Sequence, residues 1–139
     1  MRIAYPAVIA YDQADKVHNV DFPDLPGCIT FGKTRDEALL MASDALSLYL
    51  ESIMDRKLVL PKPSTRAGTV LIEPRPGVAF ALWLRARRKD SGMTLTEAAD
   101  KLGVKYQVYQ KLENPGTSNP TLKTLKKLEK VFGMELVAI

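Results

Sequence analysis

Four aspartates lie close together near the N-terminus, and side chains of this type can hold a divalent metal ion for phosphoryl-transfer chemistry. They are Asp12, Asp15, Asp21 and Asp24. Aspartate also forms turns, because its carboxylate accepts hydrogen bonds from nearby backbone N–H groups, and we interpret these four as turn residues. His18, the only histidine, falls on a predicted surface strand, and Cys28, the only cysteine, has no neighbour that would stabilise a thiolate. The sequence therefore predicts no catalytic residue, no metal site and no cofactor.

A second group of residues could bind nucleic acid. Thr94 and Glu97 have the spacing of a capping box, which predicts a helix over Leu95–Leu102. Ala98 and Ala99 are small enough for a second helix to approach closely, and Gly103 suits the left-handed position that ends a helix. The next predicted helix, Tyr106–Leu112, has apolar anchors at Val108, Tyr109 and Leu112. This pattern is typical of a helix-turn-helix, whose second helix lies in the major groove.

That geometry assigns roles to the polar residues around the second helix. Tyr106, Gln107 and Lys111 are expected to face base edges, and Gln110 either bases or backbone, because Gln bonds well to adenine and Lys to guanine. Lys105, Asn114 and the Thr94 cap fall where phosphate contacts are expected. The alternative is a small helical bundle with a solvated polar face.

Composition and charge limit the class of protein. The chain has 139 residues, with 46% hydrophobic and 26% charged, which are globular values. Residues 1–65 carry seven Lys and Arg against nine Asp and Glu, whereas residues 66–139 carry thirteen against seven, so the second half is the basic one. One cysteine excludes an intramolecular disulfide. Without a signal peptide or a membrane-spanning apolar run, we expect a cytoplasmic protein that joins the nucleoid when bound to DNA.

The elements that position these residues divide the chain into an α+β part and an all-α part. We predict domains over 1–73 and 78–139, joined by a hinge over 74–77. The first domain is predicted to hold a small antiparallel sheet and one long helix, which is opened by a capping box of Thr34 and Glu37 and ends near Arg56. The predicted strands are Ile3–Ala10, Val17–Phe22, Cys28–Gly32 and Thr69–Glu73.

Two further expectations concern packing. The first strand is apolar almost throughout, which predicts burial on both faces, and Pro6 requires an edge or a bulge on one side. Further helices are expected over 78–91 and 121–132, the latter with an apolar stripe of Leu122, Leu125, Leu128 and Phe132. The opposite face of the helix over 121–132 carries Lys123, Lys126, Lys127 and Lys130. We interpret these lysines as solvated rather than as contacts to nucleic-acid phosphates. The β-prone tail Glu135–Ile139 could pair with its copy, and a homodimer or a higher oligomer through this domain is expected.

The segment Asp21–Glu51 and the Pro-rich connection after it carry a family resemblance. The residues concerned are the corner Pro23–Cys28, the Gly32 to Thr34 turn, Glu37-Ala38 at the helix start, and Leu60–Ser64. In this order they resemble the HicB antitoxin family, and Val108–Pro115 is similar to the Xre/Cro-type helix-turn-helix of one branch. One departure from that branch is the predicted helix over 78–91, the first helix of the second domain. It is longer and more basic than is usual, with Arg85, Arg87, Arg88 and Lys89.

The resemblance implies an antitoxin whose first domain, a partial ribonuclease-H-like fold, binds and blocks HicA, a small ribonuclease that cleaves mRNA. The second domain would repress the shared operon. The predicted first strand lacks the carboxylate that ribonuclease-H enzymes place there, so we expect no enzymatic activity. Two alternatives are a stand-alone repressor that senses a small ligand and a residual metal-dependent nuclease.

Candidate contacts with the toxin come from the acidic first half, because an RNA-binding toxin must present positive charge. They comprise two carboxylates, residues of the Pro23–Gly27 corner and two aromatic anchors. The residues are Asp21, Asp24, Pro23, Leu25, Tyr5 and Tyr11.

Overall fold

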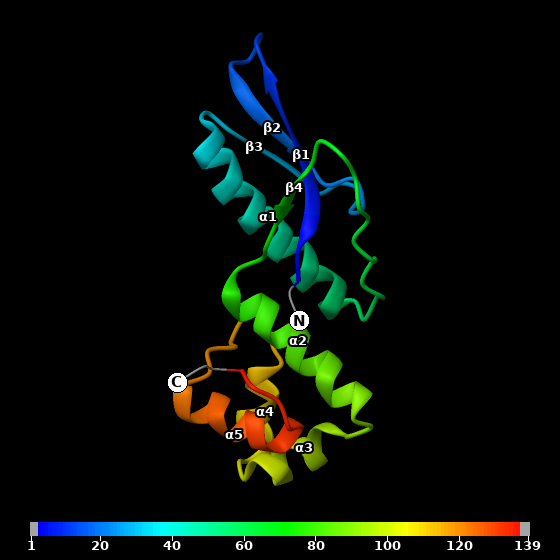
Figure 1. The fold of residues 1–139 in the computed structure, drawn as a ribbon, viewed down its shortest axis with the longest axis vertical. Helices are drawn as coiled ribbons and strands as arrows, with labels where there is room; N and C mark the ends of the chain where they lie inside the picture. Colours follow the sequence, from blue (N-terminus) through cyan, green and yellow to red (C-terminus); the bar gives the residue numbers. More distant parts are fainter. Residues whose placement is uncertain (1–2, 137–139) are drawn as a thin grey trace. The chain divides into compact units, whose positions relative to one another are not determined.

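The structure, a computed structural model, describes residues 3–136 of the chain (Figure 1). It divides into two compact units, which we call the sheet unit (residues 1–76) and the helical unit (residues 77–139). The sheet unit contains four strands and one long helix, and the helical unit contains the remaining helices, so the α+β class predicted from the sequence is confirmed. Within the described residues, no helix is long and apolar enough to span a bilayer.

The sheet has four antiparallel strands in the order β3-β2-β1-β4. Their bounds are β1 Tyr5–Asp12, β2 Val17–Asp21, β3 Ile29–Gly32 and β4 Val70–Ile72. The predicted antiparallel sheet is confirmed, and its first three strands form a meander, since β1 pairs with β2 and β2 with β3. Both ends of each strand lie within two residues of the predicted ends, which is the usual margin for assigning element boundaries.

Strand β1 is not buried on both faces along its whole length, but it has the expected edge at Pro6. Only its first three residues, Tyr5–Ala7, are fully buried, whereas Val8 and Ala10 are exposed, so burial on both faces was wrong for the rest of the strand. The reason is that β4 pairs only with Tyr5–Ala7, and the β1–β2 hairpin continues beyond it (Figure 1). Pro6 has a partner in β4, while pairing with β2 begins at Val8, so the missing N–H removes no bond on that side.

Helix α1, Arg35–Asp55, covers one face of the sheet (Figure 1). Thr34 caps it by accepting a bond of 3.0 Å from the Glu37 backbone N–H. Among the described residues no bond returns from the Glu37 side chain, so this is a single cap rather than the predicted box. Gly32 allows close contact, because a Cβ there would lie 2.3 Å from the Ala38 backbone nitrogen. The helix buries Ala38, Ala42, Leu46, Leu50 and Ile53, which recur at helical spacing, whereas Met41 is exposed.

The connection from α1 to β4 is tied to the sheet unit by three long-range contacts. Tyr5 Oη donates to the Pro61 carbonyl at 2.6 Å. The Ser64 backbone N–H and hydroxyl both donate to the Asp24 carboxylate, at 2.8 to 2.9 Å. These contacts fix a Pro-rich segment that forms no helix or strand of its own.

The helical unit contains α3 Leu95–Leu102, α4 Tyr106–Leu112 and α5 Leu122–Phe132, and α2 Pro76–Asp90 leads into it. The predicted bounds of α3 and α4 are confirmed, and Thr121 is the N-cap of α5. Helix α2 begins two residues before the predicted start, inside the expected hinge, because proline is well suited to a first helical turn. Of the predicted β-prone tail, residues 137–139 lie outside the described residues, and Glu135 and Leu136 are not in a strand.

Candidate functional site

Helices α3 and α4 form the helix-turn-helix, and local sequence signals fix both ends of α3. Thr94 Oγ1 accepts from the Glu97 backbone N–H at 3.1 Å, and the Glu97 carboxylate accepts from the Thr94 N–H at 3.2 Å. This is the predicted capping box. At the other end Gly103 has φ 75°, where a side chain would strain the backbone, so the chain can turn at once into α4.

The inward face of α4 differs from the predicted one. Tyr109 and Leu112 are buried as expected, at 1% and 9% exposure, but Val108 is 48% exposed. The residue that completes the inward face is Glu113, which is 8% exposed at the end of the helix. Arg88 binds this carboxylate, and Val108 lies on the outer flank of α4. An apolar side chain there could contact a thymine methyl group.

Arg88 and Glu113 form a buried ion pair that sequence analysis missed. Arg88 Nε donates to Glu113 at 2.7 Å, and Nη2 donates to the second carboxylate oxygen at 3.1 Å. Its Nη1 also donates to the Met93 carbonyl at 2.9 Å, so one guanidinium joins α2, the turn before α3 and the end of α4. The bond to Glu113 raises the pKa of Arg88. Burial, together with the neighbouring Glu113 carboxylate, raises the pKa of the Tyr109 hydroxyl.

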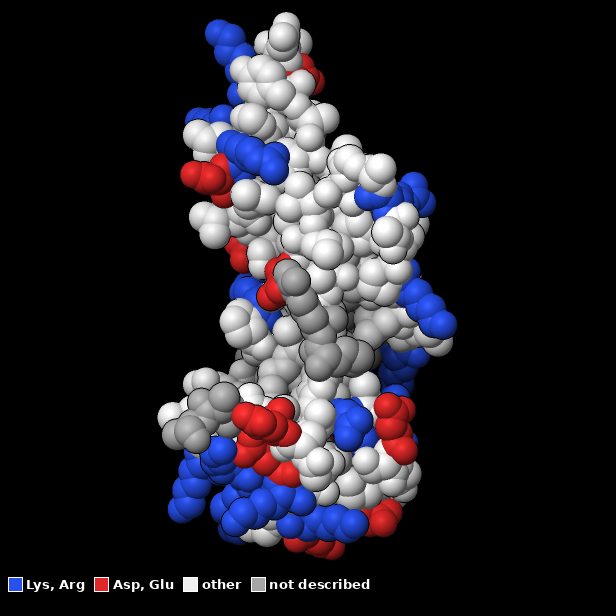
Figure 2. All heavy atoms as spheres, viewed as in Figure 1, with Lys and Arg blue, Asp and Glu red and all other residues white. Residues whose placement is uncertain are grey.

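All seven predicted DNA contacts lie on the exposed surface of the helical unit. They occupy the N-cap of α3, the N-cap and outer side of α4, and the turn after it: Thr94, Lys105, Tyr106, Gln107, Gln110, Lys111 and Asn114. The Asn114 side-chain oxygen accepts from the Gly116 N–H at 2.9 Å, which holds this side chain against the following turn. Arg and Lys side chains gather over part of this unit (Figure 2). The arrangement suits insertion of α4 into a major groove with phosphate contacts on either side.

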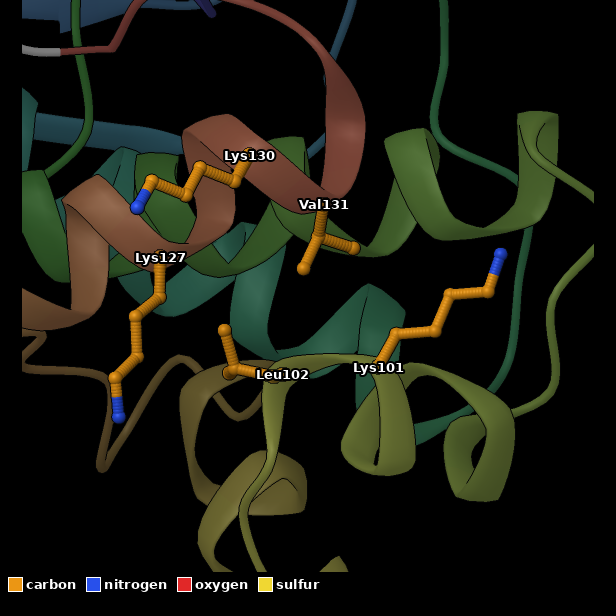
Figure 3. Close-up of a pocket in the computed structure, with 5 residues that line it drawn as sticks. All are labelled: Lys101, Leu102, Lys127, Lys130 and Val131. Atoms are coloured by element: carbon orange, nitrogen blue, oxygen red, sulfur yellow. The ribbon is translucent and has the colours of Figure 1, made fainter.

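A surface pocket of about 440 Å³ lies between α3 and α5. Leu102 and Val131 are among its lining residues, together with Lys101, Lys127 and Lys130 (Figure 3). The three ammonium groups point away from one another, so they do not converge on a common anion (Figure 3). Lys126, from the predicted lysine face of α5, pairs with Glu129 at 3.0 Å. In the apolar stripe only Leu128 is fully buried, and Leu122 is 63% exposed, contrary to expectation.

In the sheet unit the structure removes two candidate toxin contacts. Tyr5 and Leu25 are 3% and 0% exposed, so these predictions were wrong: both side chains belong to the core and cannot meet a partner on the folded surface. Asp24 is engaged by Ser64, whose N–H and hydroxyl bonds lower the pKa of its carboxyl group. Asp21 and Tyr11 are exposed and Pro23 is half-buried, so these three remain candidate contacts.

The side chains that the sequence offered for catalysis or metal binding take part in turns and packing. The Asp12 carboxylate accepts from the Ala14 and Asp15 N–H groups, at 2.9 and 3.2 Å, which confirms its interpretation as a turn residue. Burial, with a contribution from Asp21, raises the pKa of the Cys28 thiol to about 11. Between residues 3 and 136 no group of three or more His, Cys, Asp or Glu side chains could hold a metal ion. His18 packs against Tyr11 with ring centroids 4.9 Å apart.

Comparison with known proteins matches both units to families. Residues 4–73 match the family described as HicB-like antitoxin of bacterial toxin-antitoxin systems, and residues 84–139 match a helix-turn-helix family. Antitoxin HicB 2 of Photorhabdus laumondii is 31% identical over 97% of this chain and 96% of its own length. Antitoxin HicB 1 of the same organism is 32% identical over 84% of this chain and 74% of its own.

Among solved structures, a toxin–antitoxin complex from Streptococcus pneumoniae is 34% identical. The match covers 47% of this chain and 46% of that chain, with a TM-score of 0.44.

Proposed function

This chain belongs to the HicB-like antitoxin family, and from that premise we propose that it neutralises a HicA-type toxin, a small ribonuclease that cleaves mRNA, and represses the operon encoding the pair. One observation carries the proposal: a single chain joins a HicB-like unit to a helix-turn-helix whose second helix has an exposed outer side. Both targets, an mRNA-cleaving enzyme and operator DNA, would place its action in the cytoplasm.

Neutralisation by this chain would require binding and no chemistry. A folded domain that covers a nuclease active site excludes RNA by occupying the space it needs. The family and the helix-turn-helix both indicate a non-enzymatic regulator. The Cys28 thiol, with its raised pKa and buried position, is poorly suited to act as a nucleophile.

Repression would use α4 as the recognition helix. Tyr106, Gln107 and Lys111 would face base edges, and Gln110 either bases or backbone. Lys105, Thr94 and Asn114 would hold the phosphates on either side. A homodimer, or a higher oligomer through the helical unit, would place two such helices on a two-fold operator.

Two assays on the full chain test the two activities separately. Added at increasing ratio to a HicA-type toxin and a reporter mRNA, the chain should stop cleavage once the toxin is saturated. In a gel-shift assay it should bind its own promoter fragment far more tightly than random DNA of equal length. Unchanged cleavage at excess chain would refute the antitoxin role, and equal affinity for the two DNAs would refute operator recognition.

A further inference from the structure

In the described part of the chain, the sheet face opposite α1 is exposed over β2, β3 and β1 from Val8 onward. Strand pairing aligns two rows of three residues across β1, β2 and β3, namely Val8–Asp21–Ile29 and Ala10–Asn19–Phe31. We call these six residues the outer sheet face, and all six are exposed. Side chains alternate between the two faces of a strand. The intervening residues therefore point toward α1, where Val20 and Gly32 are buried.

The outer sheet face is unusually apolar for an uncovered surface. Ile29 is 67% exposed and Phe31 56%, side by side on β3, and Val8, on β1 across Asp21 of β2, is 38% exposed. Ile29 and Phe31 belong to β3, an edge strand of the sheet. Natural edge strands are commonly protected from association by charged residues, above all lysine. Contiguous exposed apolar residues that lack such protection mark interaction sites.

The charge of this face indicates what kind of partner fits it. None of the four strands contains Lys or Arg, although the chain has 20 such residues. Asp21 stands in the middle of its row, between Val8 and Ile29. A second copy docked about a two-fold axis would bring this face against itself. Each Asp21 would then be desolvated against apolar groups or another carboxylate, which is costly. A cationic partner would supply the missing counter-charge.

We propose that the outer sheet face is the surface that binds the toxin, with Phe31 and Ile29 as apolar anchors and Asp21 receiving a Lys or Arg side chain. This inference rests on the proposed function. It assigns the contact to strands β1–β3, in place of the buried Tyr5 and Leu25. An RNA-cleaving enzyme must itself present positive charge to its substrate, which matches the acidic centre of this face.

The test uses the HicA-type protein that co-purifies with the wild-type chain and measures its affinity for full-length variants. Phe31→Asp and Ile29→Asp should each weaken binding by about 30-fold or more, the effect of losing a central anchor. Asp21→Asn should slow association and flatten its dependence on salt. The matched control is Leu48→Asp, an apolar residue 60% exposed on α1, which should stay within about threefold of wild type.

Folding and self-association are controlled in the same preparations. Circular dichroism and operator binding should be unchanged in every variant, because the substituted side chains are exposed. If folded Phe31→Asp and Ile29→Asp bind as wild type does, or if Leu48→Asp alone disrupts binding, the inference is wrong while the proposed function stands. A change of oligomeric state in Phe31→Asp without toxin would instead assign the face to self-association. If no HicA-type protein binds the wild-type chain, both proposals fail.

Discussion

Replacing Glu113 with alanine leaves the Arg88 guanidinium without its anion inside the helical unit. In the native protein the Arg88 and Glu113 side chains are only 11% and 6% exposed, and two bonds of 2.7 and 3.1 Å join them. Because little solvent screens this pair, removal of one partner should cost about 3–5 kcal/mol. At about 0.05–0.15 kcal/mol per residue, the helical unit has roughly 3–9 kcal/mol of stability. We therefore expect Glu113→Ala to remove a third or more of it.

Trp83 makes this loss measurable in the full chain. It is the only tryptophan of the protein and is buried on α2, so its fluorescence during urea unfolding reports the helical unit, to which this residue belongs. The matched control replaces both partners, Arg88→Met with Glu113→Leu, and should lie within about 1–2 kcal/mol of wild type because no charge is left unpaired. A loss below about 1 kcal/mol in Glu113→Ala would refute the argument. So would a double variant as unstable as the single one.

The remaining predictions concern DNA binding and two perturbed groups. Lys111→Ala should weaken operator binding by about 1–3 kcal/mol and relax one base preference, whereas Lys105→Ala should weaken binding to all sequences and reduce the salt slope by about one; equal losses on operator and random DNA for Lys111→Ala would refute base recognition. The Asp24 carboxyl should titrate, by NMR, below its ordinary pKa of 3.8, and Ser64→Ala should raise that midpoint. Since the folded pKa is the lower one, the stability Asp24 contributes is complete above its ordinary pKa and is lost as pH falls through the folded value. Cys28 should react slowly with a thiol reagent at pH 8 until urea unfolds the sheet unit, because the thiol is buried and its pKa is about 11; fast labelling of the folded protein would contradict this.

Elements whose ends are fixed by neighbouring residues could be predicted from the sequence. The bounds of α3 follow from the Thr94 capping box and from Gly103, both of which act within one helical turn. The meander of β1–β3 follows similarly from closely spaced apolar segments and the turns between them. These signals do not depend on the rest of the fold.

Contacts between distant residues could not be predicted in the same way. Ser64 and Asp24 are forty positions apart in the sequence, and Arg88 and Glu113 are twenty-five apart. No local sequence pattern predicts either pair. Glu113 is buried at the end of α4 while Val108 is exposed, against the apolar pattern of the helix. The burial of Tyr5 has a similar cause, because its hydroxyl bonds to Pro61 in a connection without regular structure.

The uncovered sheet face became visible only through strand register. Val8, Asp21 and Ile29 are unremarkable in the sequence, and the pairing of three strands places them in one row. The sequence did identify Asp21 as a candidate contact, on charge alone. Its apolar neighbours on that face were missed, because apolar residues in short strands are ordinarily expected to be buried.

Native mass spectrometry of the protein purified from its own host tests the antitoxin role most directly. We expect a complex in which a small basic protein accompanies this chain in a defined ratio, and the mass also gives the number of copies of each. The chain alone as a homodimer, recovered from cells in which a HicA-type protein is being made, would contradict the antitoxin role and favour a stand-alone repressor.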